Sequence, residues 1–251
     1  MILGTAKLHF DEDITRAKAL LNLAHGLPDG SVKNDVFRSA WMIGVGASDA
    51  FFCDAYADLV SRTLRAKEFQ SSGKIPDRLG NLSVPAAAVL NASSSWRWRM
   101  AARGIIEKQS VLSLDEVKKF LNLFCREGQK LLQAETIEVW IVHPGSKQRN
   151  FGISRAAYNA LPAGSKSSAK KAALKKFSSQ MQGVFQRRHD CIHNCDRPKI
   201  AIQAISADVT EKAILDVEFL VNRCTDHLQV EYPKYLKHNN YNGHTRNRVG
   251  A

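Results

Sequence analysis

Apolar side chains recur along most of the chain at the spacing that places them on one face of an α-helix. The pattern is clearest over residues 11–24, 33–68, 169–196 and 210–230. These segments predict long amphipathic helices that pack against one another through their apolar faces. The predicted fold class is therefore all-α, with the helices forming a bundle.

Shorter elements are predicted between the long helices. A helix is expected at 98–109, and another begins at Ser113, where a serine cap precedes acidic residues in the first turn. The run 136–142 (TIEVWIV) has the β-branched and aromatic content of a strand. We expect 136–165 to form a small strand and loop insertion, with a short helix near 153–160.

Glycine and proline positions set further boundaries. Gly44 and Gly46 are expected to loosen the helix in which they lie, and Pro198 is expected to end the third long helix. No composition shift marks a linker between domains. The chain therefore predicts one domain over 1–231, followed by a flexible tail over 232–251.

Composition points to a protein of the cytoplasm. No run approaches the roughly 18 consecutive apolar residues that a membrane-spanning helix needs. The first residues, MILGTAKLHFDEDITRAK, lack the layout of a secretory signal. The five cysteines are too scattered for a disulfide framework, so free thiols are expected.

The net charge of +12 is unevenly distributed. The interval from Gly145 to His189 contains no Asp or Glu. Its ten basic residues are Lys147, Arg149, Arg155, Lys166, Lys170, Lys171, Lys175, Lys176, Arg187 and Arg188. A one-sided basic surface attracts polyanions and predicts a nucleic-acid partner. The alternative is a solvated, lysine-rich helix.

Arg188 and His193, late in the long basic helix, could cut RNA without a metal or cofactor. A guanidinium holds a phosphate with fixed geometry, and an imidazole transfers protons near neutral pH. On a helical wheel Arg188 lies in the middle of an apolar stripe, where a lone charge is costly. The two side chains lie about 140° apart on an ideal helix. Their convergence on one phosphate requires the reach of the arginine, a distorted helix end or a second subunit.

Asp49 presents the same anomaly with the opposite sign. It lies in the middle of an apolar stripe on the helix over 33–68, so we expect Asp49 and Arg188 to share one pocket. The alternative is a helix that rotates or kinks at Gly44 and Gly46, so that Asp49 meets water.

Two other features suggest further chemistry. His189, Cys191, His193 and Cys195 alternate, but on a helix the histidines and the cysteines face roughly opposite ways, so the four cannot chelate one zinc ion. A site of two histidines with remote ligands stays open. Elsewhere, Trp96 and Trp98 lie among arginines and could stack on bases. We favour core packing for both tryptophans.

The run Arg188-His189-x-x-x-His193-Asn194-x-Asp196-Arg197, late in a long helix and followed by one more helix, resembles the HEPN superfamily. Its signature is an arginine and a histidine separated by four to six residues. The form here is most similar to the RiboL-PSP-HEPN branch of bacterial toxin and defence systems. The resemblance is strong over 180–240, looser over 10–68 and limited to helical character over 69–165.

The resemblance implies an up-and-down helical bundle that forms a homodimer with a composite active site. It implies metal-independent endoribonuclease activity that leaves 2′,3′-cyclic phosphate and 5′-hydroxyl ends. Arg188 and His193 would be catalytic. From their positions we infer supporting roles for His189, Asn194 and Asp49. The residues expected to bind RNA are Arg187, Lys170, Lys171, Lys175 and Lys176.

The resemblance also implies a toxin or antiviral-defence effector, with an antitoxin or a defence protein as partner. Some toxins of the family carry a modifiable tyrosine two residues after the histidine. Cys195 stands there in this chain, which argues against that mode of neutralisation. The alternatives are a non-catalytic RNA-binding HEPN module and a basic helical interaction protein.

Overall fold

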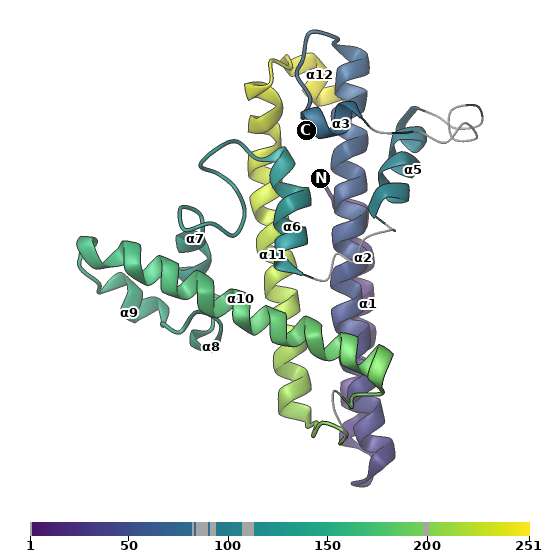
Figure 1. Cartoon of the computed structure of the whole chain (residues 1–251), viewed down its shortest axis with the longest axis vertical. Helices are drawn as coiled ribbons and strands as arrows, with labels where there is room; N and C mark the ends of the chain where they lie inside the picture. Colours follow the sequence, from purple (N-terminus) through teal and green to yellow (C-terminus); the bar gives the residue numbers. More distant parts are fainter. Residues whose placement is uncertain (1, 82, 84–89, 91–93, 107–112, 198–200) are drawn as a thin grey trace. The chain divides into compact units, whose positions relative to one another are not determined.

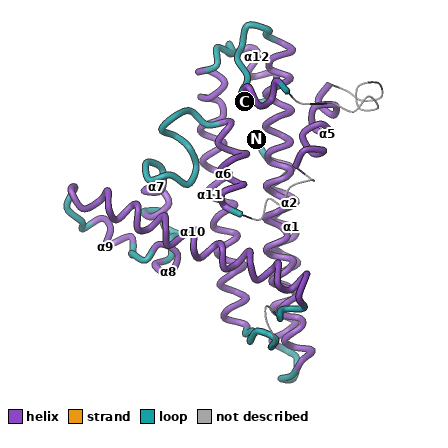
Figure 2. Tube along the Cα trace, in the orientation of Figure 1, coloured by secondary structure: helices purple, strands orange, loops and turns teal. Residues whose placement is uncertain are grey.

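Helices make up the regular structure of the described part of the chain. The computed structural model describes residues 2–81, 83, 90, 94–106, 113–197 and 201–251, and Figure 2 shows no strand among them. The elements in chain order are α1 (Gly4–His25), α2 (Ser31–Phe69), α3 (Asp77–Gly80), α5 (Ser94–Ile106), α6 (Leu114–Leu121), the 3₁₀ turn η1 (Asn122–Phe124), α7 (Ile137–Ile141), α8 (Gln148–Phe151), α9 (Arg155–Asn159), α10 (Ala163–Asn194), α11 (Ala207–His238) and α12 (Gly243–Arg248). The predicted fold class is confirmed, because the chain is an all-α helical bundle.

The chain divides into two compact units. The first unit comprises residues 1–7, 51–131 and 224–251, and the second comprises 8–50 and 132–223. The long helices α2 and α11 each contribute residues to both units. Whether the chain folds as a single domain over 1–231 stays a prediction.

In the second unit, Gly44 allows helices to approach closely. A Cβ atom at this position would lie 3.0 Å from Cγ1 of Ile214 on α11 and 3.6 Å from Cβ of Ala17 on α1. A larger residue would push these helices apart. Gly44 and Gly46 do not interrupt α2, which is one helix from Ser31 to Phe69. Gly44 therefore serves packing, and the expected loosening of the helix at the two glycines is wrong.

The short helices α7 and α8 lie against α10 within the second unit (Figure 1), and aromatic rings make the contact. Phe151 stacks on Phe177 with ring centroids 5.1 Å apart, and Trp140 meets Phe177 edge-on at 5.6 Å. Phe219 of α11 contacts all three rings. Each buried ring contributes roughly 1.5–3 kcal/mol of hydrophobic stabilisation.

The predicted strand over 136–142 is wrong, because Ile137–Ile141 form the helix α7. Ile137, Trp140 and Ile141 are buried, and Val139 is exposed. Burial at intervals of three and four residues is the helical pattern. Packing of this face overrides the strand preference of its β-branched residues. The expected insertion over 136–165 accordingly contains the helices α7, α8 and α9, of which α9 matches the helix expected near 153–160.

The first unit has its own aromatic core. Tyr56 of α2 lies 4.9 Å from Phe120 of α6, measured between ring centroids, and Phe124 lies 6.2 Å from Tyr232 of α11. The buried hydroxyl of Tyr232 hydrogen-bonds that of Thr63 at 3.0 Å. These contacts satisfy the polar tip of a ring that is otherwise fully enclosed.

The predicted flexible tail from residue 232 onward is wrong. Helix α11 continues through Pro233 to His238, and α12 follows. Tyr235, Tyr241 and Val249 are buried. Proline removes one helical hydrogen bond, and the burial of the neighbouring aromatic residues outweighs that loss.

Other boundaries follow the sequence closely. The Ser113 side chain caps α6 by accepting a hydrogen bond from the Glu116 amide at 3.1 Å. Helix α5 ends at Ile106, and the last residues of the helix predicted at 98–109 lie outside the described residues, as does Pro198. Within the described residues, no helix is both long enough and apolar enough to cross a membrane.

Candidate functional site

The end of α10 carries the residues singled out by the sequence, and Arg188 lies on its inner side. Arg188 is half-buried, whereas His189 and His193 are exposed. The Nε and Nη2 atoms of Arg188 each lie 3.9 Å from the position that a Cβ atom would occupy at Gly46 on α2. These are ordinary van der Waals distances, and they place the guanidinium next to this part of α2. The helical wheel anticipated this inward placement.

Asp49 lies one helical turn beyond Gly46 and is half-buried. The structure thus brings Arg188 to the part of α2 that carries Asp49. In the described part of the chain, no ion pair or hydrogen bond joins Arg188 to Asp49, and the buried Nε of Arg188 has no hydrogen-bond acceptor. Their common neighbourhood is therefore observed, but a direct contact between the two side chains is not.

His189 and His193 form an exposed pair on the polar face of α10. Their ring centroids lie 4.4 Å apart, with 43° between the ring planes. This spacing follows from residues one helical turn apart. Asn194, the last residue of α10, is also exposed. An imidazole pair at an accessible helix end can accept and donate protons to a ligand that arrives from solvent.

The chain reverses immediately after this pair. Cys195 and Asp196 both adopt left-handed backbone conformations, with φ angles of 49° and 58°. The Asp196 amide donates to the carbonyl of Asp190 at 2.9 Å, which closes the turn. Left-handed geometry costs about 1–2 kcal/mol per residue for side chains other than glycine. Compensating contacts must hold this turn.

Asp196 makes those contacts from a fully buried position. Its Oδ2 atom accepts from Nε of Arg38 at 2.7 Å and from Nη2 of Arg187 at 3.0 Å. The Arg187 guanidinium also lies over the ring of Trp41, 5.2 Å from its centroid. Trp41 in turn donates to the Val184 carbonyl at 3.2 Å. This network joins α2, α10 and the turn after α10.

Arg187 was predicted to bind RNA, but the structure assigns its charge to this interior network. Arg38 and Asp196 complete the network, and neither was expected to do so from the sequence. The only local signal was the acid two residues after the helix end. Arg38 lies 158 residues from Asp196, and no pattern in the chain links the two.

Exposed lysines continue along α10 toward its beginning. Lys171, Lys175 and Lys176 are exposed. Lys170 is half-buried and lies 3.5 Å from the carboxylate of Glu138 on α7. Glu138 is thus one of the acids from outside the acid-free interval that pair with its basic residues. Three of the four predicted lysines stay accessible to a polyanion.

A second buried carboxylate stabilises the same unit. Asp216 of α11 is buried and accepts from Arg149, from Asn150 at 2.9 Å and from Gln180 at 3.3 Å. It links α8, α10 and α11. The sequence interpretation missed it, because its partners lie 36 to 67 residues away.

Metal and thiol chemistry find little support at this site. Among the described residues, no three or more His, Cys, Asp or Glu side chains come together as a metal site. Burial, reinforced by the charge of Asp196, raises the pKa of Cys191 to about 11. This thiol is protonated at neutral pH and is a poor nucleophile.

Comparison with known proteins adds no relative. No protein-family model, no curated protein and no solved structure matches the chain. The assignment of the site therefore rests on its own residues.

Proposed function

We propose that this protein is a metal-independent endoribonuclease of the HEPN type. The observation that carries the proposal is the exposed imidazole of His193 at the end of α10. Five residues earlier stands Arg188, whose guanidinium forms no ion pair within the described residues. The exposed lysines of α10 supply an approach for a polyanion.

The reaction would need only these side chains. His193 would take the proton of a ribose 2′-hydroxyl, whose oxygen then attacks the adjacent phosphorus. The bond from phosphorus to the 5′-oxygen breaks as the new bond to the 2′-oxygen forms. A protonated histidine returns a proton to the leaving 5′-oxygen. Arg188 would stabilise the charge that develops on the phosphorane. His189, Asn194 and Asp49 would orient these groups.

Geometry favours a site shared between two subunits. Arg188 is turned toward α2 and His193 toward solvent on a continuous helix, about 140° apart. A dimer would allow the arginine of one chain and the histidine of the other to meet one phosphate. Ile192, between them, is 47% exposed, which suits a contact surface.

Cleavage of RNA in EDTA tests the activity. Wild-type protein should cut RNA with chelator present, whereas His193→Ala and Arg188→Ala should each lose at least about a hundredfold in rate. Matched controls in the same unit are His25→Ala and Arg16→Ala, since both residues are exposed and distant in sequence. Activity that persists in both site variants, or that chelation abolishes, would refute this mechanism.

Mixing the two inactive variants tests the shared site. Random exchange makes about half of the dimers mixed, and each mixed dimer has one intact site of two. About a quarter of the wild-type activity should return on mixing. No recovery, or a strictly monomeric protein in analytical ultracentrifugation, would exclude the composite site.

The exposed lysines also support the second candidate, a non-catalytic RNA-binding module. Substitution of Lys171, Lys175 and Lys176 by Gln should reduce the slope of log K for RNA binding against log[salt] by about two, because each phosphate contact on a single strand contributes about 0.7 to that slope. Salt-sensitive binding without cleavage under any condition would favour this candidate over the nuclease.

We further propose a cytoplasmic toxin or antiviral-defence effector, with an antitoxin or defence protein as partner. This setting rests on the resemblance of the motif alone. Expression in a bacterial host tests it, since wild-type protein should arrest growth and His193→Ala should not. Equal growth of both strains would contradict the toxin assignment.

A further inference from the structure

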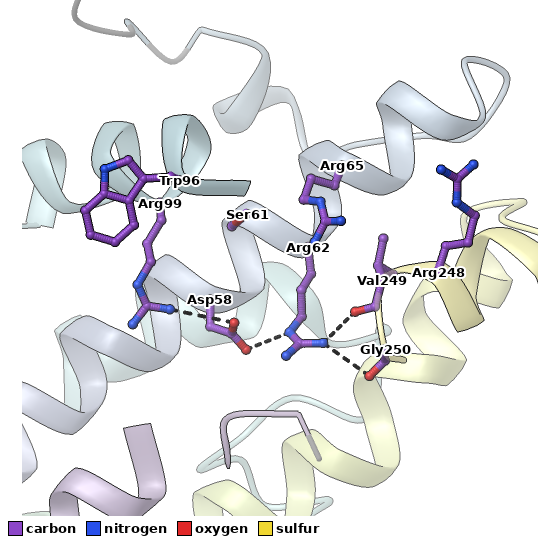
Figure 3. A pocket seen from close by; sticks show the side chains of 9 residues that line it. All are labelled: Asp58, Ser61, Arg62, Arg65, Trp96, Arg99, Arg248, Val249 and Gly250. Carbon is purple, nitrogen blue, oxygen red and sulfur yellow. Dashed lines mark hydrogen bonds and ion pairs between the residues drawn. The ribbon is translucent and has the colours of Figure 1, made fainter. Parts of the chain in front are cut away.

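A pocket of about 390 Å³ opens in the first unit and is lined chiefly by arginines (Figure 3). Its charged residues come from α2 (Asp58, Arg62 and Arg65), from α5 (Arg99) and from α12 (Arg248). Trp96 of α5 completes one wall. Spacings of three and four residues along α2 and α5 place these side chains on common helix faces.

Two of the arginines are fixed in place by the acid of the pocket. Oδ2 of Asp58 accepts from Nε of Arg62 at 2.7 Å, and Oδ1 lies 3.8 Å from Nη1 of Arg99. Arg99 also donates to Asp54 at 3.2 Å. Figure 3 shows Arg62 reaching on to the carbonyl groups of Val249 and Gly250. The charges of these two arginines are therefore matched by carboxylates.

The other two arginines have no such match. Within the described residues neither Arg65 nor Arg248 forms an ion pair, and the buried Nε of Arg65 has no hydrogen-bond acceptor. Both guanidiniums lie against the Phe69 ring, with their central carbons 5.6 Å and 3.7 Å from its centroid. Two like charges held at one ring repel each other, and an anion between them would relieve that repulsion.

Trp96 adds an aromatic surface to the same pocket, next to Arg99 in Figure 3. Its side chain is 53% exposed, contrary to the expected core packing. Trp98 is half-buried and donates to Glu68 at 2.9 Å, so only Trp96 of this pair lines the pocket. An exposed indole in the same pocket as arginines without an ion pair is suited to stacking on a nucleobase whose phosphates reach those arginines.

We propose that this pocket binds a free nucleoside phosphate, with the phosphates between Arg65 and Arg248 and the base against Trp96. The volume lies within the range of about 300–1,000 Å³ that small-molecule sites occupy. A single nucleotide fits a pocket of this size better than a length of RNA. This site is separate in sequence from the residues of the proposed nuclease and does not depend on that proposal.

A second basic pocket of the same unit provides a control. It has a volume of about 380 Å³ and is lined by Arg126, Lys234, Lys237 and His238. These lining residues include no tryptophan, and Arg126 is engaged by Glu231 through a bond of 2.6 Å. Positive charge and size are therefore similar in the two pockets, and the arginine pair and the indole distinguish them.

Calorimetric titration of the full chain with ATP, tripolyphosphate and adenosine tests the proposal. ATP should bind most tightly, since it alone offers both phosphates and a base. The double variant Arg65→Gln/Arg248→Gln should lose at least about tenfold in affinity for ATP and for tripolyphosphate. Trp96→Ala should weaken ATP binding by about tenfold and leave tripolyphosphate binding unchanged. Circular dichroism checks that each variant is folded.

The control variant Lys234→Gln/Lys237→Gln should bind ATP as the wild type does. The proposal is overturned if ATP does not bind, or if this control loses affinity while the arginine variant keeps it. It is also overturned if tripolyphosphate binds as tightly as ATP. Short RNA with a 5′-triphosphate, titrated in the His193→Ala protein, distinguishes the two sources of such a ligand. Tighter binding of that RNA than of ATP would assign the pocket to RNA ends.

Discussion

Two arginine clusters of this protein use the same side chain in opposite ways. In the second unit, Arg38 and Arg187 share the fully buried carboxylate of Asp196. In the first unit, the arginine pocket keeps two guanidiniums, those of Arg65 and Arg248, without a carboxylate among the described residues. Both clusters look alike in a sequence, as basic residues on helices. The number and burial of the acids around each cluster decide whether the arginines hold the fold or stay available to a ligand.

Removal of the buried acid should have the largest effect. Asp196→Asn removes the buried carboxylate that Arg187 and Arg38 share and leaves Arg38 only the exposed carboxylate of Asp35, which should cost about 3–5 kcal/mol of unfolding free energy. Urea denaturation measures the loss. The matched control is Asp35→Asn, because Asp35 also pairs with Arg38 but its side chain is 72% exposed. That variant should change stability by less than about 1 kcal/mol. Equal losses in the two variants would break the comparison.

Removal of the acid in the arginine pocket should cost less. Asp58 is half-buried, and after Asp58→Asn the Arg99 side chain keeps its bond to Asp54. We expect a loss of about 1–2 kcal/mol in urea denaturation. A loss as large as that of Asp196→Asn would mean that this carboxylate, too, is chiefly structural.

The pH dependence of the ion pair between Arg126 and Glu231 sharpens the comparison within the first unit. Burial raises the pKa of the Glu231 carboxyl, but hydrogen bonds and charge from Arg126 lower it by more, so the net pKa lies below the ordinary 4.5. The unfolded chain therefore takes up this proton at a higher pH than the folded chain. Stability from the pair is complete above about pH 4.5 and is lost as the pH falls through the lower folded pKa.

Urea midpoints measured from about pH 6 down to about pH 3 check this expectation. Wild-type protein should lose stability more steeply over that range than Glu231→Gln. Glu127→Gln serves as the control, since Glu127 is 85% exposed in its pair with Lys130. A wild-type curve parallel to that of Glu231→Gln would show that the buried pair contributes nothing to acid sensitivity.

The smallest effect is expected for an unmatched arginine. Arg248→Gln removes one of two neighbouring like charges from an exposed position, so stability should change by less than about 0.5 kcal/mol. The same variant should bind ATP more weakly. A large loss of stability, measured in the same urea assay, would place Arg248 with the structural arginines.

The helical class and the inward side of Arg188 were predictable, because both follow from periodicity along a single helix. The Ser113 cap was predictable for the same reason, since its signal spans only one turn. The strand over 136–142 was predicted from residue preference, although the spacing of Ile137, Trp140 and Ile141 already indicated a helix. The end of α11 was missed because Pro233 resembles a helix terminator, and only the burial of Tyr235 shows otherwise.

Contacts distant along the chain account for most of what the sequence could not show. The roles of Asp196 and Asp216 depend on partners many residues away, and no local pattern announces them. The arginine pocket joins α2, α5 and α12, whose residues meet only after folding. Trp96 and Trp98 share the same local sequence, yet the fold buries one partly and exposes the other.

The uneven burial of the tryptophans also has an optical consequence. Trp41 and Trp140 are 5% and 3% exposed, whereas Trp96 is 53% exposed. Dissolved acrylamide quenches the fluorescence of an accessible indole far more than that of an enclosed one. Trp96 is therefore an intrinsic fluorophore in the lining of the arginine pocket. A ligand bound in the pocket would shield Trp96 from the quencher, so reduced quenching would report binding without any label.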